Sequence, residues 1–96
     1  MKAVLIVHNS AIDDDVNDAL VSVGIEQYTK LTNVLGKGQF SEPHLNIEVW
    51  PETNYGTLVI TEPDVAQCLM DKIRELRKTL ASEGIKAFCW QIDDVT

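Results

Sequence analysis

The chain is poor in basic residues and has no long apolar run. Its 96 residues include 8 Lys and Arg against 15 Asp and Glu, which gives a formal net charge of −7. Nucleic-acid phosphates and anionic membrane surfaces both attract basic faces, so this balance argues against either partner. The apolar run Ala3–Val7 is too short for a signal-peptide core, and no stretch reaches transmembrane length.

Cysteine and histidine are also scarce. The two cysteines, Cys68 and Cys89, form no CxxC pair, and we expect both to be small buried residues in a reduced, cytoplasmic protein. The two histidines, His8 and His44, lack the spacing typical of a metal site, so we expect no metal.

No arrangement typical of a catalytic centre is present. Combinations of the Ser-His-Asp or Cys-His type lack supporting local context. The acidic run Asp13–Asp15 follows Ser10, and a capped helix start explains it, because the positive end of the helix dipole attracts carboxylates. We therefore expect no enzyme activity.

Residues 1–96 are expected to form a single domain with four strands and two helices. Apolar and β-branched runs predict the strands, and apolar residues at helical spacing predict the helices. The expected strands are Ala3–Val7, Glu26–Leu35, Leu45–Thr61 with an interruption near Pro51, and Lys86–Ile92. The expected helices begin at the N-caps Ser10 and Thr61 and end at Gly24 and Gly84.

The order β-α-β-β-α-β is the ferredoxin-like pattern, an α+β fold with a four-stranded antiparallel sheet and two helices on one face. The helices cover one side of the sheet only, yet Ala3–Val7 and Leu58–Ile60 contain no polar residue. A chain this short also buries only about 60–65% of its unfolded surface when it folds alone. Another copy of the chain is the economical cover for the open side.

A candidate ligand-binding segment follows the second expected strand. The glycines of Gly36-Lys37-Gly38 let the backbone approach an anion and Lys37 supplies a positive charge, whereas the alternative is a strand-end turn that needs positive φ. The rim formed by Asn9 and Ser10 after the first strand is a second candidate. Thr29 is a third candidate, weighed against simple strand propensity. The two tryptophans, Trp50 and Trp90, are expected in the core or in an interface.

Several motifs occur in the same order as in one known family. They are Ile12–Leu20, similar to LDDVREAL; Gly36–Gln39, similar to GFGRQ; Asn46–Pro51, similar to VVDFLP; and Glu62–Ile73, similar to PDDIVDTCVDTI. The chain thereby resembles the nitrogen-regulatory PII signalling proteins over essentially its whole length. The resemblance implies a homotrimer that holds adenine nucleotide between subunits and reads it out through the long loop after the second strand.

Three departures from the family change the expected ligand. The loop at Gln39–His44 is shorter and has no tyrosine. The family's phosphate loop, TGxxGDGK, corresponds to Thr79–Lys86, which keeps the lysine but has a single glycine and an acidic Glu83. The family's lysine after the third-strand proline is Glu52 here, and its C-terminal arginines have no counterpart. An adenine nucleotide stays possible as a cofactor, but we expect ATP to bind weakly or not at all.

The resemblance and the residues together indicate a non-enzymatic regulatory protein of nitrogen regulation. It would bind a small anionic metabolite or nucleotide at subunit interfaces and signal through Gln39–His44 to a partner such as a membrane transporter or a metabolic enzyme. The ligand-binding residues expected are Asn9, Ser10, Thr29, Gly36, Lys37, Gly38, Gln39 and Lys86. Two alternatives stay open, namely a CutA-like metal-binding trimer that uses His8 or His44 and an interaction module without a ligand.

Overall fold

The computed structural model describes residues 1–36, 53–80 and 83–96. The elements follow the order β1 (Lys2–Asn9), the 3₁₀ turn η1 (Ser10–Ile12), α1 (Asp13–Ser22), β2 (Thr29–Val34), β3 (Asn54–Thr61), α2 (Pro63–Thr79) and β4 (Ile85–Gln91). Several expectations fall outside the described residues, namely those for Lys37, Gly38, Gln39, the loop to His44, Trp50, Glu52 and the strand portion 45–52.

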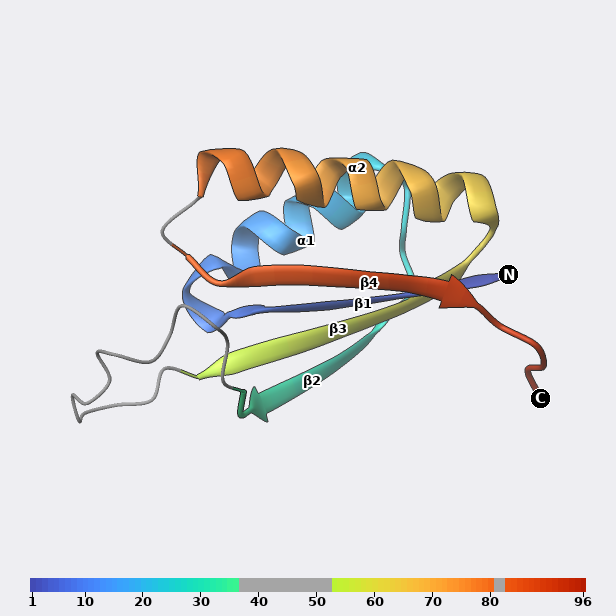
Figure 1. Cartoon of the computed structure of the whole chain (residues 1–96), viewed down its shortest axis with the longest axis horizontal. Helices are drawn as coiled ribbons and strands as arrows, with labels where there is room; N and C mark the ends of the chain where they lie inside the picture. Colours follow the sequence, from blue (N-terminus) through green and yellow to red (C-terminus); the bar gives the residue numbers. More distant parts are fainter. Residues whose placement is uncertain (37–52, 81–82) are drawn as a thin grey trace.

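The four strands form one antiparallel sheet in the order β2-β3-β1-β4, and both helices lie on the same face of it (Figure 1). Strand β1 is central, and Leu5 pairs with Leu58 of β3 on one side and with Phe88 of β4 on the other. The predicted ferredoxin-like α+β fold is therefore confirmed. Within the described segments, no helix is long and apolar enough to span a membrane.

The core lies between the sheet and the helices. Successive strand side chains point to opposite faces, so Val4, Ile6 and His8 of β1 all point toward the helices, and all three are buried. They meet apolar residues from both helices and from the neighbouring strands. The buried apolar residues around them are Ile12, Val16, Ala19, Leu20, Ile25, Val59, Ala66, Leu69, Ile73 and Ile85.

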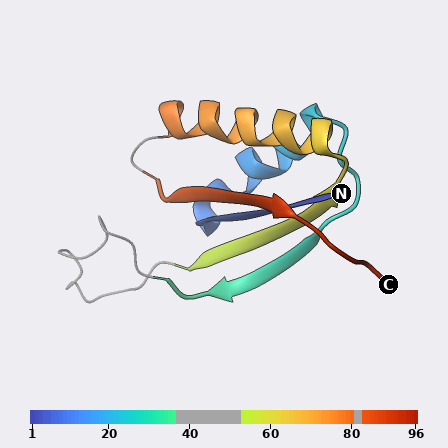
Figure 2. The same cartoon turned by 45° about the vertical axis from the view of Figure 1, so that its right-hand side comes forward.

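The opposite face of the sheet carries no helix, as the turned view in Figure 2 shows. Alternation places Ala3, Leu5 and Val7 of β1 on this open face, beside apolar residues of the other strands. Its large exposed members, with their exposed fractions, are Leu31 (47%), Ile60 (37%), Phe88 (50%) and Trp90 (45%). Trp90 is thus outside the core of this chain, and the prediction of a doubly apolar central strand is confirmed.

The end of α1 follows the prediction closely. Gly24 has φ +81°, a left-handed conformation that residues with a side chain rarely adopt. Its N–H donates to the Val21 carbonyl at 3.0 Å, and the Ile25 N–H donates to the Leu20 carbonyl at 3.0 Å. This pair of bonds is a Schellman motif, and burial of Ile25 against the helix completes it.

The other predicted helix ends were wrong in detail. Asn9, not Ser10, caps the first turn, because its side chain accepts a hydrogen bond from the Ala11 N–H. The N-cap of α2 is Glu62 rather than Thr61, and it makes no side-chain capping bond. Thr61 is instead the last residue of β3, paired with Lys2, so sheet pairing takes precedence over capping. Helix α2 ends at Thr79, before the glycine expected to stop it.

Strand β2 is shorter than predicted at both ends. Residues 26–28 carry the chain from the helix layer down to the sheet edge, which leaves them without strand pairing (Figure 1). Near its other end the register with β3 shifts between Leu31 and Val34, and Asn33 has φ 58°. Asparagine tolerates this left-handed conformation better than most residues, so the irregularity is locally encoded.

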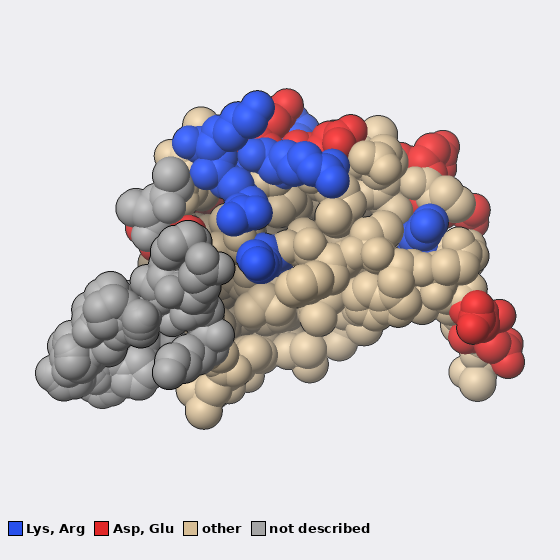
Figure 3. Space-filling view, in the orientation of Figure 1, with Lys and Arg blue, Asp and Glu red and all other residues tan. Residues whose placement is uncertain are grey.

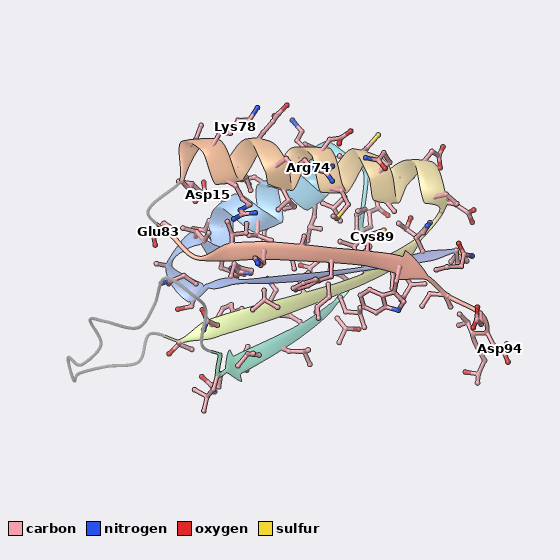
Figure 4. All side chains as sticks on the ribbon, viewed as in Figure 1. Asp15, Arg74, Lys78, Glu83, Cys89 and Asp94 are labelled. Atoms are coloured by element: carbon pink, nitrogen blue, oxygen red, sulfur yellow. The ribbon has the colours of Figure 1, made fainter. Side chains whose placement is uncertain are left out.

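The prediction that both cysteines are buried was wrong. Cys68 and Cys89 are exposed free thiols. Cys89 pairs with Val4 and shares its face of the sheet, but β4 is an edge strand that the helices do not cover fully (Figure 4). Cys68 lies on α2 away from the buried positions Leu69 and Ile73.

Candidate functional site

One end of the sheet brings together four chain segments. At this end β1 finishes at Asn9, opposite Asn54 at the start of β3. The Asn9 N–H donates to the Gly84 carbonyl at 2.9 Å, and the Ser10 N–H donates to the Thr53 carbonyl at 2.9 Å. The Asn9–Ser10 corner is thus bonded to the residues that directly follow 37–52 and to those that follow 81–82.

The corner has a defined local conformation. Asn9 is extended, with φ −61° and ψ 138°, and its side-chain oxygen accepts the Ala11 N–H at 2.8 Å. This capping bond turns the chain into η1 and then into α1. Both backbone and side chain of Asn9 are therefore used to position the corner, which makes it a rigid part of the surface.

The structure places four of the predicted ligand-binding residues at this end. Asn9 and Ser10 form the corner, and Lys86 pairs with Val7, two positions from the end of β1. Gly36 follows the end of β2, where Val34 pairs with Asn54. The predicted residues Lys37, Gly38 and Gln39 lie outside the described part of the chain.

Thr29 does not join this group. It pairs with Leu58, which in turn pairs with Leu5, so it lies near the middle of the sheet on the open face. At about 3.3 Å per strand residue, it is more than 10 Å along the sheet from Asn9. The sequence predicted a candidate here from residue type alone, without the register that separates it from the corner.

Most basic residues are concentrated on α2 and the start of β4, although the chain as a whole is acidic. Five of its 8 Lys and Arg residues come from α2 and the start of β4, namely Lys72, Arg74, Arg77, Lys78 and Lys86. Figure 3 shows these cations gathered over α2 and β4, and Figure 4 places Asp94 at the opposite end. This basic surface lies beside the corner.

Two of the five cations have an acidic neighbour on α2. Arg74 lies 3.0 Å from the Asp71 carboxylate, and Lys72 lies 4.0 Å from Glu75. Arg77, Lys78 and Lys86 form no ion pair with another described residue. Glu83 and Asp15 lie at the same end (Figure 4), and these acids offset part of the positive charge.

A polar cluster that sequence analysis missed is packed behind the corner, on the helix side of the sheet. Lys30 of β2 donates from Nζ to Asp13 Oδ1 at 2.7 Å and to Asn17 Oδ1 at 2.9 Å. The Asn17 amide donates to Asp13 Oδ2 at 3.3 Å, and His8 Nε2 lies 3.5 Å from Asp13 Oδ1. The cluster connects β1, α1 and β2 through side chains alone.

His8 is the buried member of this cluster, only 1% exposed. Its Nδ1 lies 2.9 Å from the Asn9 carbonyl oxygen, which can only accept, so Nδ1 carries the hydrogen. Its Nε2 has no hydrogen-bond partner among the described atoms. Burial lowers the pKa of His8 below 6.5, against the opposing effects of the Asn9 carbonyl and the Asp13 carboxylate, and His8 is therefore neutral near pH 7.

The described residues offer no support for a metal centre. No group of three His, Cys, Asp or Glu side chains within residues 1–36, 53–80 and 83–96 comes together as a ligand set. At His8 the Lys30 ammonium already occupies the adjacent carboxylate at 2.7 Å, and it repels a second cation. His44, the other candidate ligand, lies outside these residues.

The architecture matches several solved structures closely. CPII from Thiomonas intermedia, solved with ADP and bicarbonate, superposes with a TM-score of 0.68 at 19% identity, covering 95% of this chain and 86% of that one. A PII-like signalling protein from Thermus thermophilus gives a TM-score of 0.68 at 20% identity, with coverages of 93% and 83%. At these identities the likeness establishes the fold.

A second CPII structure from Thiomonas intermedia, with ADP, AMP and acetate, gives a TM-score of 0.67 at 18% identity, covering 97% of this chain and 88% of that one. The curated proteins contain no significant sequence match to the chain. The family model described as "Nitrogen regulatory protein P-II" matches residues 1–96. The resemblance seen in the ordered motifs is therefore confirmed, and the chain belongs to the nitrogen regulatory protein P-II family.

Proposed function

We propose that this PII-like signalling protein is a non-enzymatic regulator that binds a small anionic metabolite or nucleotide at the Asn9–Ser10 corner. The observation that carries the proposal is the pair of backbone hydrogen bonds from the corner to Thr53 and Gly84. These bonds join the corner directly to Thr53, the residue that follows the segment 37–52, so a ligand held at the corner would act beside it. Binding there can change that segment, including Gln39–His44, and so alter docking on a partner.

Charge favours a small anion as the ligand. Arg77, Lys78 and Lys86 are cations without a described ion-pair partner near the corner, and exposed cations attract anions. Residues 79–86 contain only one glycine and include Glu83, so this segment has less of the glycine freedom that lets a backbone wrap a long phosphate chain, and it carries an opposing charge. A nucleoside mono- or diphosphate or bicarbonate therefore fits better than ATP. The solved relatives from Thiomonas intermedia hold ADP with bicarbonate, and ADP with AMP and acetate.

The open face of the sheet supports assembly into a homotrimer. Leu31, Phe88 and Trp90 leave a contiguous apolar surface in the isolated chain, and such a surface marks an interface. Lys86 lies on the same side of β4 as Phe88 and Trp90, since the three alternate along the strand. A copy packed on this face brings its own residues close to Lys86, and the ligand site then lies between subunits.

Partner and location follow from the same proposal. A cytoplasmic regulator of nitrogen metabolism acts by docking on a membrane transporter or a metabolic enzyme, and the segment Gln39–His44 is the element proposed to dock. Regulation of this kind needs binding energy and no bond making, which agrees with the expectation that the protein is not an enzyme.

The test is calorimetric titration with ADP, AMP, bicarbonate and ATP on matched variants. Lys86→Ala and Lys37→Ala are each expected to weaken the bound anion by about 1.5–3 kcal/mol, the range for a charge-assisted hydrogen bond. Lys72→Ala is the control, because it removes the same charge from a lysine that pairs with Glu75. Equal losses in all three variants, or no binding of any of the four ligands, would contradict the proposal.

A further inference from the structure

We propose that His8, Asp13, Asn17 and Lys30 form a proton-sensitive latch that holds β2 against α1, and that a proton on His8 opens the latch by displacing Lys30 from Asp13. The inference goes beyond the proposed function, because the latch acts in the protein without any ligand. It makes the position of β2 dependent on pH.

Two nitrogen atoms converge on a single carboxylate oxygen in this cluster. Lys30 Nζ lies 2.7 Å from Asp13 Oδ1, and His8 Nε2 lies 3.5 Å from the same atom. The shorter distance is a charge-assisted hydrogen bond and the longer one is not a hydrogen bond. With neutral His8, Lys30 therefore holds the oxygen alone.

A proton changes what His8 does. Its Nδ1–H is already committed to the Asn9 carbonyl at 2.9 Å, so the proton must bind at Nε2. Nε2 then becomes a charged donor that faces Asp13 Oδ1, and a shift of about 0.7 Å gives the usual length of a charge-assisted bond. Burial removes the access of Nε2 to water, and Asp13 Oδ1 is the charged acceptor that lies nearest to it at 3.5 Å.

The groups around His8 determine which of the two cations moves away from Asp13. Asp13 of α1 is the acid that faces His8, Lys30 of β2 is a second cation, Tyr55 of β3 presents its ring edge-on at 6.1 Å, and Ile85 of β4 brings no charge. One carboxylate carries a single negative charge, so a second cation leaves this partly buried group with a net positive charge, which is costly to bury. The Lys30 side chain is 21% exposed and can turn to water, whereas the His8 side chain is 0% exposed. Lys30 is therefore the group that leaves.

Release of Lys30 matters because β2 is weakly held otherwise. It is an edge strand with β3 as its only neighbour in the described sheet, and regular pairing covers Thr29–Leu31 before the register shifts. Lys30 lies in the middle of that short pairing and is its side-chain link to α1. Loss of the link leaves the strand with fewer constraints than any other in the sheet.

The test uses the full chain without ligand, in a His44→Gln background that leaves His8 as the single histidine. Imidazole resonances of His8 and amide-exchange protection of Thr29–Leu31 are followed by NMR between about pH 5 and 8. As the pH falls through the midpoint of the His8 titration, exchange protection in β2 is expected to decrease about tenfold. This decrease should exceed any change at Leu69 in α2, which serves as the internal control. Protection in β2 that does not follow the His8 titration would overturn the proposal.

A second variant separates the latch from general loosening of the fold. Lys30→Met removes the competing cation, so the midpoint of the His8 titration is expected to rise. Exchange protection of β2 should be low at every pH and should no longer change as His8 titrates. Lys78→Met, which removes a lysine outside the cluster, is expected to leave both readouts as in the parent. An unchanged His8 midpoint in Lys30→Met, with the fold intact, would show that the two groups do not share Asp13.

Discussion

Lys30 and Asp13 are 17 residues apart in sequence, yet their charged groups lie 2.7 Å apart and join the edge strand β2 to the first turn of α1. Asp13 is the first residue of α1, where the positive end of the helix dipole also favours its negative charge. Both side chains are only about one-fifth exposed, 21% and 22%. The pair is thus shielded more than an ordinary surface ion pair.

Removal of the Lys30 ammonium is predicted to destabilise the protein. Lys30→Met leaves Asp13 with a partly buried charge and Asn17 without its donor, so the free energy of unfolding should fall by about 1.5–3 kcal/mol. Urea denaturation gives the value. Lys78→Met removes an exposed lysine from α2 and should change stability by no more than about 0.5 kcal/mol. Equal effects of the two changes would mean that the ion pair does not stabilise the fold.

Stability is predicted to depend on the charge of His8. Burial lowers its pKa in the folded state below the 6.5 of the unfolded chain, so the unfolded state takes up the proton first. The free energy of unfolding should therefore be at its full value above pH 6.5 and decline as the pH falls from 6.5 through the folded-state pKa. Urea titrations of the His44→Gln protein across this pH range provide the check. The control is His8→Leu in the same background, in which the free energy of unfolding should lose this dependence on pH. A gain in stability on mild acidification would contradict it.

The conformation of Gly24 leads to a further prediction. Gly24→Ala places a side chain at φ +81° and should cost about 1–2 kcal/mol of stability, although nothing lies within 4 Å of the added carbon. Gly84→Ala is a matched control, because it also meets open space and has no left-handed φ. The midpoints of thermal unfolding for the two variants should differ clearly. Similar midpoints would show that backbone strain at position 24 is small.

The open face leads to a prediction about assembly. Phe88→Asp introduces a charge where a second copy is proposed to pack, so the oligomer should dissociate while the fold of each chain survives, since Phe88 is 50% exposed. Light scattering coupled to size exclusion measures the mass. Val21→Asp alters a 73% exposed residue of α1, on the opposite side of the molecule, and should leave the mass unchanged. A wild-type protein that is monomeric at micromolar concentration would rule out the interface.

Much of the fold could be predicted because its signals are local. The apolar run of β1 and the helical spacing of Val16 and Leu20 depend on residues close in sequence, and Gly24 marks the end of its helix by itself. The exposure of Cys89 could not be predicted in this way. It depends on β4 being an edge strand and on how far the helices extend over it, and both are properties of the assembled sheet.

Part of the candidate site could be predicted from the sequence in the same way, and part could not. Strand order placed Asn9, Ser10 and Lys86 at one end of the sheet, because β1 ends where an antiparallel β4 begins. The polar cluster was missed since its members come from three elements. One signal was present in the sequence, namely that alternation along β2 places Lys30 on the side opposite Thr29 and Leu31, where the helices lie. A lysine at a helix-facing position needs a buried partner, and Asp13 provides it.

The central place of β1 has a consequence for how the protein is made. Lys2 pairs with Thr61 on one side and with Gln91 on the other, so the first strand to be synthesised pairs with the last. Contacts that close such long loops form slowly, because the chain loses much of its freedom before the contacts compensate for it. During translation β1 can gain β3 as a neighbour early, but its second edge stays unpaired until residue 91 has left the ribosome. A nascent chain therefore exposes one edge of β1 until β4 has been synthesised.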